Sequence, residues 1–389
     1  MIDISVIIPT FNDAEVFKKN LAAVLEQSYA PKQIIVIDSS SNDDIKNITL
    51  SIDSDFKIDY FRFSRLFPGE ARNQGAKKAK FEFLAFLDSK TIPEKDWLKT
   101  NASYLIEKKF DVVFGSTKYT ANSRFQNALR ASVFGRNAIE TTPGTLISKN
   151  NFTLSGGFQE KIRTGDDLYW RQKIKNMNIT SIQPTRITLK YSQLEKNIFH
   201  SIWRFFTYQI YAAQIAIQDN QKKLYLFFFL LLLLAFLVPK WNSIVGWEDS
   251  TFYIPNITKI YFFVYFITTF FTWFTNKFIK QFLSLFLKKI LVAATLVNLF
   301  IFAYLWNGGV AEAESSVLYI PHITKIYVSS LLVVSFLYRG IYFPFYGGIR
   351  AKELFPFNWI YFGLIGLILD IAKAPGYIIG GLFYLFRKN

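Results

Sequence analysis

Short apolar strands that alternate with amphipathic helices are the feature of this sequence that most constrains its fold. Strands are expected at Ile4–Ile8, Ile34–Ile37, Ile58–Phe63, Phe83–Leu87, Val112–Gly115 and Pro143–Ile147, and helices at Asp13–Gln27, Asp44–Ser51, Gly69–Ala79, Asp96–Lys108 and Asp166–Lys175. The first, second and fourth strands are nearly continuous apolar runs, which is typical of strands buried on both faces. The alternation predicts an α/β domain with a parallel, doubly wound sheet. Residues 118–142 are polar and show no clear period.

Acidic side chains follow the expected strands. Asp38 and Asp43 come after the second strand, Asp88 after the fourth, and Asp166 and Asp167 open a helix. In a doubly wound sheet the carboxyl ends of the strands face one crevice, so Asp38 and Asp88 are expected to converge there. Such carboxylates, beside a loop rich in Ser and Asn, suit a ribosylated base and a metal-bound diphosphate. The glycine-rich phosphate loops of dehydrogenases and P-loop enzymes are missing from the sequence, which argues against both classes.

The amino-acid composition restricts the chemistry further. The chain contains no cysteine and two histidines, His200 and His322, so a thiol nucleophile is excluded and a histidine-based triad is not expected. Acid–base or metal chemistry therefore falls to Asp and Glu. The net charge of +16 suits anionic lipid or phosphorylated small molecules, and no nucleic-acid-binding pattern is present.

The second half of the chain is dominated by apolar segments. They are Leu224–Val238, Ile260–Phe274, Ile290–Trp306, Ile326–Tyr338 and Trp359–Ile371, and Ala374–Phe386 is a sixth span, a re-entrant piece or an interfacial helix. Each is near the short end for crossing a hydrocarbon core of roughly 30 Å. A soluble helical domain is the alternative, but five such segments favour a transmembrane domain of about four to six helices over residues 224–389.

Charges in the loops predict how this region is oriented. The loops that would lie on one side carry Lys222, Lys223, Lys277 and Lys289, with further cations between the fourth and fifth segments. The positive-inside rule then predicts a multi-pass protein of the cell membrane whose N-terminal domain is cytoplasmic. Residues 193–223 form an expected amphipathic helix at the membrane interface. An ordinary surface helix is the alternative for this segment.

Six stretches of the first half resemble family 2 glycosyltransferases with a GT-A fold. They are VIIPTFND (Val6–Asp13), IIVIDSSSND (Ile34–Asp43), GEARNQGAKKA (Gly69–Ala79), FLAFLDSKTIPEKDWL (Phe83–Leu98), SGGFQE (Ser155–Glu160) and GDDLYWR (Gly165–Arg171). They occur in the family's order and at its usual spacings, and the resemblance covers about residues 1–210. It implies a GT-A, nucleotide-sugar-binding domain over residues 1–192.

The resemblance implies a role for each matched position. The residues that would cradle the base and ribose of the donor are Pro9, Thr10, Phe11, Asn12 and Asp38, and Arg72 would lie near the donor. Asp88 matches the first residue of the DxD motif, which holds Mg²⁺ or Mn²⁺ on the donor diphosphate. Asp167 matches the general base, and Asp166 would position that base or the acceptor. Three simpler interpretations stay open: Asp38 as a turn cap, the acidic pair as N-cap residues only, and Arg72 as a surface charge.

Lys90 departs from the family pattern, because it stands where the second metal-binding Asp of DxD is expected. Its ammonium could neutralise the leaving diphosphate directly, in place of part of the metal's work. Alternatively, Asp88 alone could hold a weakly bound metal while Lys90 points away. Loss of activity is the third possibility.

The sequence thus predicts an inverting glycosyltransferase of polysaccharide biosynthesis. It would move a sugar from a nucleotide-sugar to a lipid-linked or glycan acceptor at the cytoplasmic membrane face. A processive synthase would need a QxxRW motif, which Trp203 and Arg204 with Gln209 do not supply. Synthesis of polyprenyl-phosphate sugars is a further possibility. The alternative from another class is a membrane scaffold or transport component with a degenerate, non-catalytic sugar-nucleotide domain.

Overall fold

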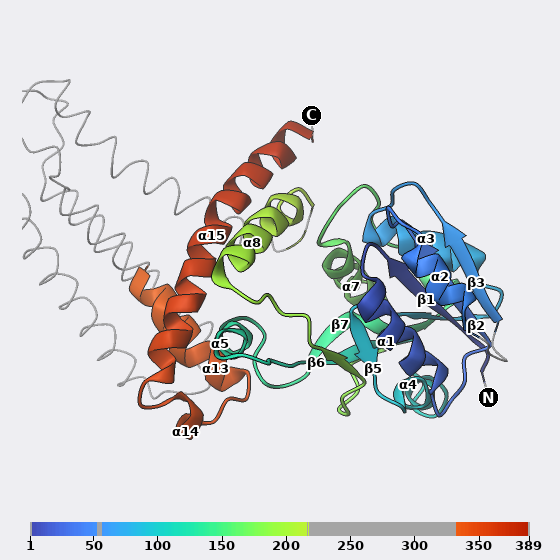
Figure 1. The fold of residues 1–389 in the computed structure, drawn as a ribbon, viewed down its shortest axis with the longest axis horizontal. Coiled ribbons are helices and arrows are strands. Elements are labelled where there is room, and N and C mark those ends of the chain that lie inside the picture. The colour runs from blue at the N-terminus through green and yellow to red at the C-terminus, as the bar shows by residue number, and fades with distance from the viewer. Residues whose placement is uncertain (1, 53–56, 216, 218–331, 388–389) are drawn as a thin grey trace, which may run out of the picture. The chain divides into compact units, whose positions relative to one another are not determined.

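The computed structural model describes residues 2–52, 57–215, 217 and 332–387 (Figure 1). The chain divides into two compact units, one made of Met1–Lys222 with Arg339–Asn389 and the other of Lys223–Tyr338. The expected apolar segments Leu224–Val238, Ile260–Phe274 and Ile290–Trp306 lie outside the described residues, as do residues 326–331 of the segment Ile326–Tyr338. The first unit contains the elements discussed below.

Nine strands of the described residues form one sheet at the centre of this unit. They are β1 (Ile4–Thr10), β2 (Gln33–Asp38), β3 (Lys57–Arg62), β4 (Phe83–Phe86), β5 (Thr91–Pro93), β6 (Val112–Tyr119), β7 (Ile139–Ser148), β8 (Ser181–Ile182) and β9 (Leu189–Tyr191). Their order is β3-β2-β1-β4-β7-β6-β9-β5, and β8 pairs with β6. All six strands expected from the sequence are present, within a few residues of their predicted bounds.

Helices cover both faces of the sheet, as the doubly wound prediction requires. One face carries α1 (Ala14–Leu25), α2 (Asp44–Leu50) and α4 (Trp97–Ile106), and the other carries α3 (Pro68–Lys78), α6 (Lys149–Leu154) and α7 (Asp166–Asn176). Successive side chains of β1 point to opposite faces, so Val6 and Ile8 pack with the first set and Ile7 with the second. Burial on both faces explains why the strand is apolar throughout.

The prediction of an all-parallel sheet is wrong at β7. Strands β3, β2, β1 and β4 are parallel, but β7 runs antiparallel to both of its neighbours, β4 and β6. The connection from β6 to β7 contains α5 (Arg124–Val133), which packs against α13 (Phe343–Tyr346) and α15 (Asn358–Arg387) instead of covering the sheet. Because the chain never crosses a face of the sheet there, it re-enters from the edge at which β6 ended.

Two helices differ from the sequence-based expectation. Residues 118–142, which show no clear period, contain α5; its N-cap Ser123 accepts a hydrogen bond from the amide of Gln126. The expected amphipathic helix over residues 193–223 is α8 (Ile198–Ala212) and begins later, because Asn197 caps it by accepting from the His200 amide. After α8, Ile215 and Ile217 pack against Ile162 of the sheet domain instead of continuing the helix.

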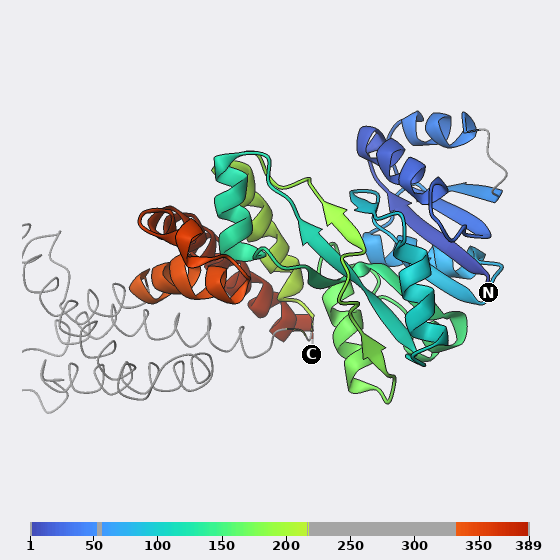
Figure 2. The ribbon, with the colours of Figure 1, turned by 90° about the horizontal axis from the view of Figure 1, so that it is seen from below.

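The expected segments Trp359–Ile371 and Ala374–Phe386 form one helix, α15, with Pro375 inside it. This helix lies beside α8 in both views (Figures 1 and 2). Gly376 and Gly380 allow the close approach, because a Cβ there would lie 2.6 Å from the Phe206 carbonyl oxygen and 2.4 Å from that of Ile210. Small residues four positions apart commonly let helices pack this closely.

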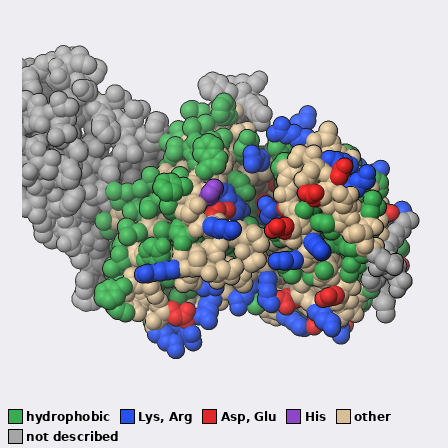
Figure 3. All heavy atoms as spheres, viewed as in Figure 1, with side chains coloured by type: hydrophobic (Ala, Val, Ile, Leu, Met, Phe, Trp, Pro, Cys, Tyr) green, Lys and Arg blue, Asp and Glu red, His purple; other side chains and the backbone are tan. Residues whose placement is uncertain are grey.

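Helix α15 is long and apolar enough over Asn358–Phe383 to cross a membrane, and among the described residues it alone meets that criterion. Its outer side exposes large apolar residues, among them Leu364, Ile371 and Phe383, while α8 exposes Phe199 and Trp203. Figure 3 shows hydrophobic side chains gathered over this helical part of the surface. Aromatic and aliphatic side chains in such numbers are typical of surfaces that contact lipid or another protein.

Gly75 tests how tightly α3 packs on the sheet, since a Cβ there would lie 2.2 Å from Cγ2 of Ile7. We expect Gly75→Ala to destabilise the protein by about 1–3 kcal/mol through overpacking. Gly381→Ala is the matched control, because nothing lies within 4 Å of a Cβ at that helical position. Thermal unfolding of the detergent-solubilised protein would measure both. Equal melting temperatures for the two variants would show that α3 does not pack as described.

Candidate active site

The carboxyl edge of the sheet gathers the polar residues that the sequence singled out. Asp38 ends β2 with a buried carboxylate: Oδ1 accepts from the Thr10 hydroxyl (3.1 Å) and the Ser40 amide (2.9 Å), and Oδ2 accepts from the Tyr60 hydroxyl (2.7 Å). Burial together with the Asp38 charge raises the pKa of Tyr60, so this hydroxyl stays a donor. Asp38 therefore caps the turn that follows β2, as one of the two interpretations predicted, and it shapes the loop at this edge.

The residues Pro9–Asn12 lead from β1 into a loop that is tied to the one after β2. The Asn12 amide donates to the Ser40 hydroxyl (2.9 Å), and Asn12 Oδ1 accepts from the Ser41 amide (2.9 Å). Asn12 has a φ of +52°, a left-handed conformation that Asn tolerates better than most residues. Phe11 remains 58% exposed beside these loops. An exposed aromatic face above two joined loops is suited to stacking on a planar ring.

Arg72 connects two elements that the sequence could not show to be neighbours. Its Nη1 donates to Asp166 Oδ2 (2.7 Å) and its Nη2 to Asp88 Oδ1 (2.6 Å). The guanidinium carbon also lies 5.2 Å from the centre of the Phe158 ring. The side chain is only 4% exposed, so the interpretation of Arg72 as a surface charge is wrong. Through Arg72 the turn after β4 is held against the start of α7.

The turn after β4 presents Asp88 and Lys90 to solvent. The Asp88 side chain is 36% exposed, and Lys90 is exposed. The Ser89 hydroxyl between them points the other way and donates to the Asp13 carboxylate. Burial raises the pKa of Asp13, and the Ser89 hydrogen bond and the nearby Lys90 charge offset this only in part. Lys90 therefore lies within electrostatic reach of a second carboxylate, Asp13.

The two acids of α7 have different surroundings. Gly165 precedes them at φ +92°, and a Cβ there would lie 3.0 Å from side chains of Ile215 and Ile217. Gly165 is itself the N-cap, so the interpretation of the acidic pair as N-cap residues only is wrong. Asp166 is 3% exposed and turns to Arg72. Asp167 is partly exposed, and within the described chain its carboxylate accepts no hydrogen bond.

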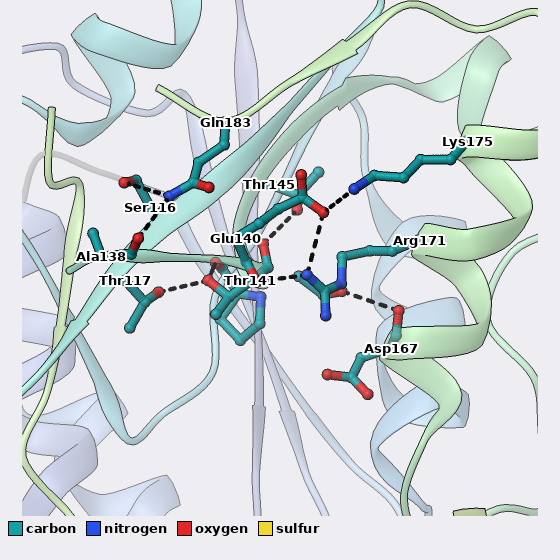
Figure 4. Close-up of polar contacts among 12 residues, drawn as sticks. Ser116, Thr117, Ala138, Glu140, Thr141, Thr145, Asp167, Arg171, Lys175 and Gln183 are labelled. Atoms are coloured by element: carbon teal, nitrogen blue, oxygen red, sulfur yellow. Dashed lines mark hydrogen bonds and ion pairs between the residues drawn. The ribbon is translucent and has the colours of Figure 1, made fainter. Parts of the chain in front are cut away.

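Contacts between α7 and β7 fix the position of Asp167. Its carbonyl oxygen accepts from the Thr142 hydroxyl (3.3 Å). One turn later, Arg171 Nη1 donates to the Glu140 carbonyl (2.5 Å), and Lys175 Nζ lies 2.6 Å from Glu140 Oε1 (Figure 4). These side chains hold α7 against the first residues of β7. The backbone at Asp167 is thus held in place, and its carboxylate is partly exposed.

Electrostatically, Asp88, Asp166 and Asp167 share the one guanidinium of Arg72. Burial by itself would lower the pKa of Arg72, but the three carboxylates outweigh it and raise that pKa. For Asp166, burial raises the pKa to about 7, against the opposing effect of Arg72 and with the help of Asp167 and Asp88. Asp166 therefore keeps a proton more readily near neutral pH than a carboxyl group with an ordinary pKa does.

The residues at the DxD position do not make a divalent-metal site by themselves. Mg²⁺ and Mn²⁺ prefer several oxygen ligands. Asp88 offers one carboxylate here, already bonded to Arg72, and the exposed ammonium of Lys90 stands two positions later. Throughout the described ranges, no cluster of three Asp, Glu, His or Cys side chains is spaced to hold a metal ion.

Sequence reasoning missed several residues of this edge. Asp13, Tyr60 and Thr142 contact the predicted residues directly, and Ser89 contacts Asp13. Arg171 holds the helix that carries Asp167 against β7. Asp13 is the last residue of the matched stretch VIIPTFND, which was a usable signal. Tyr60 and Thr142 carried none, because their roles depend on which strands become neighbours.

The raised pKa of Asp166 predicts how the stability of the protein depends on pH. A carboxyl group with a folded-state pKa above its unfolded value binds its proton more tightly when folded, so its contribution to stability falls as pH rises from about 4 to about 7. We expect the melting temperature of the wild type to fall relative to that of Asp166→Asn across this window. Asp3→Asn, on the surface, controls for the loss of one carboxylate. A constant difference between wild type and Asp166→Asn would contradict the assignment.

Known proteins resemble the first part of the chain. Residues 5–165 match the Glycosyl transferase family 2. An uncharacterised glycosyltransferase of Rickettsia conorii is 30% identical over 174 residues, which cover 42% of this chain and 28% of that protein. Glycosyltransferase AglE of Haloferax volcanii is 29% identical over 44% of this chain and 60% of its own length. The glucosyltransferase WfgD of Escherichia coli is 26% identical over 52% of this chain and 83% of its own length.

Among solved structures, a mannosyltransferase of Pyrobaculum calidifontis shares 21% identity, with a TM-score of 0.43 over 56% of this chain and 67% of that one. The chain spans less than a third of the length of the three Rickettsia relatives it matches. The family match over residues 5–165 nevertheless includes Asp38, Arg72 and Asp88. Residues 5–165 of this chain therefore match the Glycosyl transferase family 2, and the structure gives this part of the chain an α/β fold.

Proposed function

We propose that the protein is an inverting glycosyltransferase that moves a sugar from a nucleotide-sugar to a lipid-linked or glycan acceptor. The observation that carries this proposal is the Arg72 bridge, because it holds the donor edge at Asp88 beside the accessible Asp167 carboxylate. An enzyme that joins two substrates needs the groups that bind the donor and the group that activates the acceptor at a fixed distance from each other. The family 2 relatives support transfer from a nucleotide-sugar as the reaction.

In this proposal the loops after β1 and β2 hold the nucleoside. Pro9 and Thr10 end β1 beside β2, and Asn12 follows in the loop. Phe11 offers its exposed ring to the base. Arg72 is turned to carboxylates on both sides, so it positions Asp88 and is not itself free to bind phosphate. Asp88 keeps one carboxylate oxygen for the ribose or for the edge of the diphosphate.

Asp167 is the proposed general base. Its carboxylate takes the proton of the acceptor hydroxyl while that oxygen bonds to the anomeric carbon of the sugar. The bond from this carbon to the diphosphate oxygen breaks at the same time, on the opposite face, so the configuration inverts and a nucleoside diphosphate leaves. A carboxylate free of internal hydrogen bonds can approach a substrate hydroxyl. Asp166 positions Asp167 through the start of α7 and Arg72.

Negative charge develops on the departing diphosphate, and Lys90 is an exposed cation at that edge. We assign its ammonium to neutralise the diphosphate, because a lysine binds phosphate as a compact point charge. A divalent ion bound by the donor's own phosphates and Asp88 is the competing assignment.

The acceptor is proposed from the apolar second half of the chain. The Escherichia coli relative is named for a diphosphoundecaprenol-linked acceptor, which supports a lipid-linked acceptor for this protein as well. Helix α8 would lie at the cytoplasmic membrane face, with residues 224–389, which include α15, as a multi-pass region and residues 1–192 as the catalytic domain. A scaffold with a non-catalytic sugar-nucleotide domain is the alternative, and the accessible Asp167 carboxylate favours the enzyme.

Replacing Asp167 separates these two possibilities. Asp167→Asn keeps the shape of the side chain but cannot accept the proton, so we expect sugar transfer in membranes to fall by roughly a hundredfold to ten-thousandfold. Binding of nucleoside diphosphate should be unchanged. Glu107→Gln, a surface carboxylate beyond α4, is the control. Equal transfer by Asp167→Asn and wild type would refute the role of Asp167, and no transfer by the wild type with any donor would favour the scaffold.

Chelation separates the two assignments at the diphosphate. If Lys90 neutralises the leaving group, transfer continues in excess EDTA, and Lys90→Ala lowers it by roughly tenfold to a hundredfold. Lys95→Ala, a neighbouring lysine outside the turn, serves as the control. Complete loss of transfer in EDTA, restored by Mn²⁺, would contradict the assignment and identify a metal-dependent enzyme.

A further inference from the structure

A cavity of about 570 Å³ lies beside β6, and none of the donor residues named above lines it. Its wall includes Ser116 and Lys118 of β6, Arg136 and Asn137 before β7, Gln183 after β8, and Gly348 from the C-terminal segment. Residues from the sheet, from a connecting loop and from a distant part of the chain thus line one cavity. A glycosyltransferase binds two substrates, and this cavity is space that the donor residues do not occupy.

The C-terminal segment is built into this wall. The backbone amides of Arg136 and Asn137 both donate to the carbonyl oxygen of Gly347, at 2.7 and 2.9 Å. Gly348 follows with φ at +87°, and a Cβ there would lie 2.2 Å from Asn137 Oδ1. A residue other than glycine would not fit this junction. The cavity is therefore a formed part of the fold and not a gap between loosely placed segments.

The charge of the wall is positive. Lys118 and Arg136 are the charged residues that line it, and no acidic side chain does so within the described chain. Arg136 Nη1 lies 2.5 Å from Glu353, but Arg350 Nε binds the same carboxylate oxygen at 2.6 Å. Two guanidiniums therefore share one carboxylate. Lys118 is half-buried, and the ion pairs of the described residues leave its ammonium without a carboxylate.

Neutral donors complete the cavity. The Ser116 hydroxyl oxygen accepts a hydrogen bond from Gln183 Nε2 (3.1 Å). The hydrogen of the Ser116 hydroxyl is therefore free to donate to a ligand. A lysine point charge, a guanidinium fork and a hydroxyl donor are the groups that bind phosphate oxygens. A neutral sugar would not require two cations at one wall.

We propose that this cavity binds a phosphate group of the acceptor. The inference rests on the proposed function, since it assigns the acceptor's charged end. Ala138 lies in the wall, and Thr142, whose hydroxyl bonds to the Asp167 carbonyl, is four residues along β7. Four extended residues span about 13 Å. An acceptor anchored by its phosphate here has room for sugar units between that phosphate and the hydroxyl that attacks.

The test is a titration of the detergent-solubilised full chain with inorganic phosphate, in which binding is measured as the rise in melting temperature. Saturating UDP and GDP occupy the donor edge throughout. We expect Lys118→Gln to weaken phosphate binding by about tenfold, and Lys118→Glu to weaken it further. Lys190→Gln is the matched control: Lys190 pairs with Lys118 in the strand register, is exposed, and pairs with Glu94 (2.6 Å). Ligand-free melting temperatures confirm that each variant is folded.

A second arm, with polyprenyl phosphate in detergent micelles, identifies the source of the phosphate. Lys118-dependent binding of polyprenyl phosphate assigns a lipid-linked group, and Lys118-dependent binding of inorganic phosphate alone assigns a soluble one. Equal binding by wild type, Lys118→Gln and Lys118→Glu in both arms overturns the proposal. Sugar transfer is measured separately, so Lys118-dependent phosphate binding without any transfer would refute the proposed function and leave this site standing.

Discussion

The buried guanidinium of Arg72, held between Asp88 and Asp166, is the interaction on which the candidate site depends. The Arg72 side chain is 4% exposed, so its charge needs carboxylate partners in fixed positions. Loss of one carboxylate would leave part of this charge uncompensated in a region of low dielectric constant. This requirement joins three elements: α3, which carries Arg72, the turn after β4, and the first turn of α7. The accessible Asp167 follows Asp166 directly, so its distance from the donor edge is set by the same bridge.

Much of the catalytic domain could be predicted from the sequence. Ile34–Ile37 and Phe83–Leu87 are apolar throughout because helices cover both faces of the sheet, and that is the pattern from which a doubly wound fold was inferred. Asp38 and Asp88 stand at strand ends in the sequence and at the same edge in the structure. The family resemblance then supplied roles for them, and the family match over residues 5–165 confirms the class of the domain.

Other features depend on contacts that no local pattern records. The direction of β7 follows from α5 packing on α13 and α15, more than two hundred residues later, instead of on the sheet. The pairing of Ser89 with Asp13 depends on β1 and β4 being neighbours. Helix α15 contains the two expected segments Trp359–Ile371 and Ala374–Phe386, with Asp370 and Lys373 near their junction. In the structure Arg339 pairs with Asp370 at 2.8 Å, so those charges are neutralised inside the helical packing.

The most direct test of the account is release of nucleoside diphosphate from a panel of nucleotide-sugars by the full chain in membranes, for wild type and Arg72→Lys. Lysine keeps the charge but cannot bridge two carboxylates with separate nitrogen atoms. The account predicts that the wild type turns over one class of donor and that Arg72→Lys loses most of this activity while it remains folded. Equal rates for the two proteins would contradict the central role given to the Arg72 bridge.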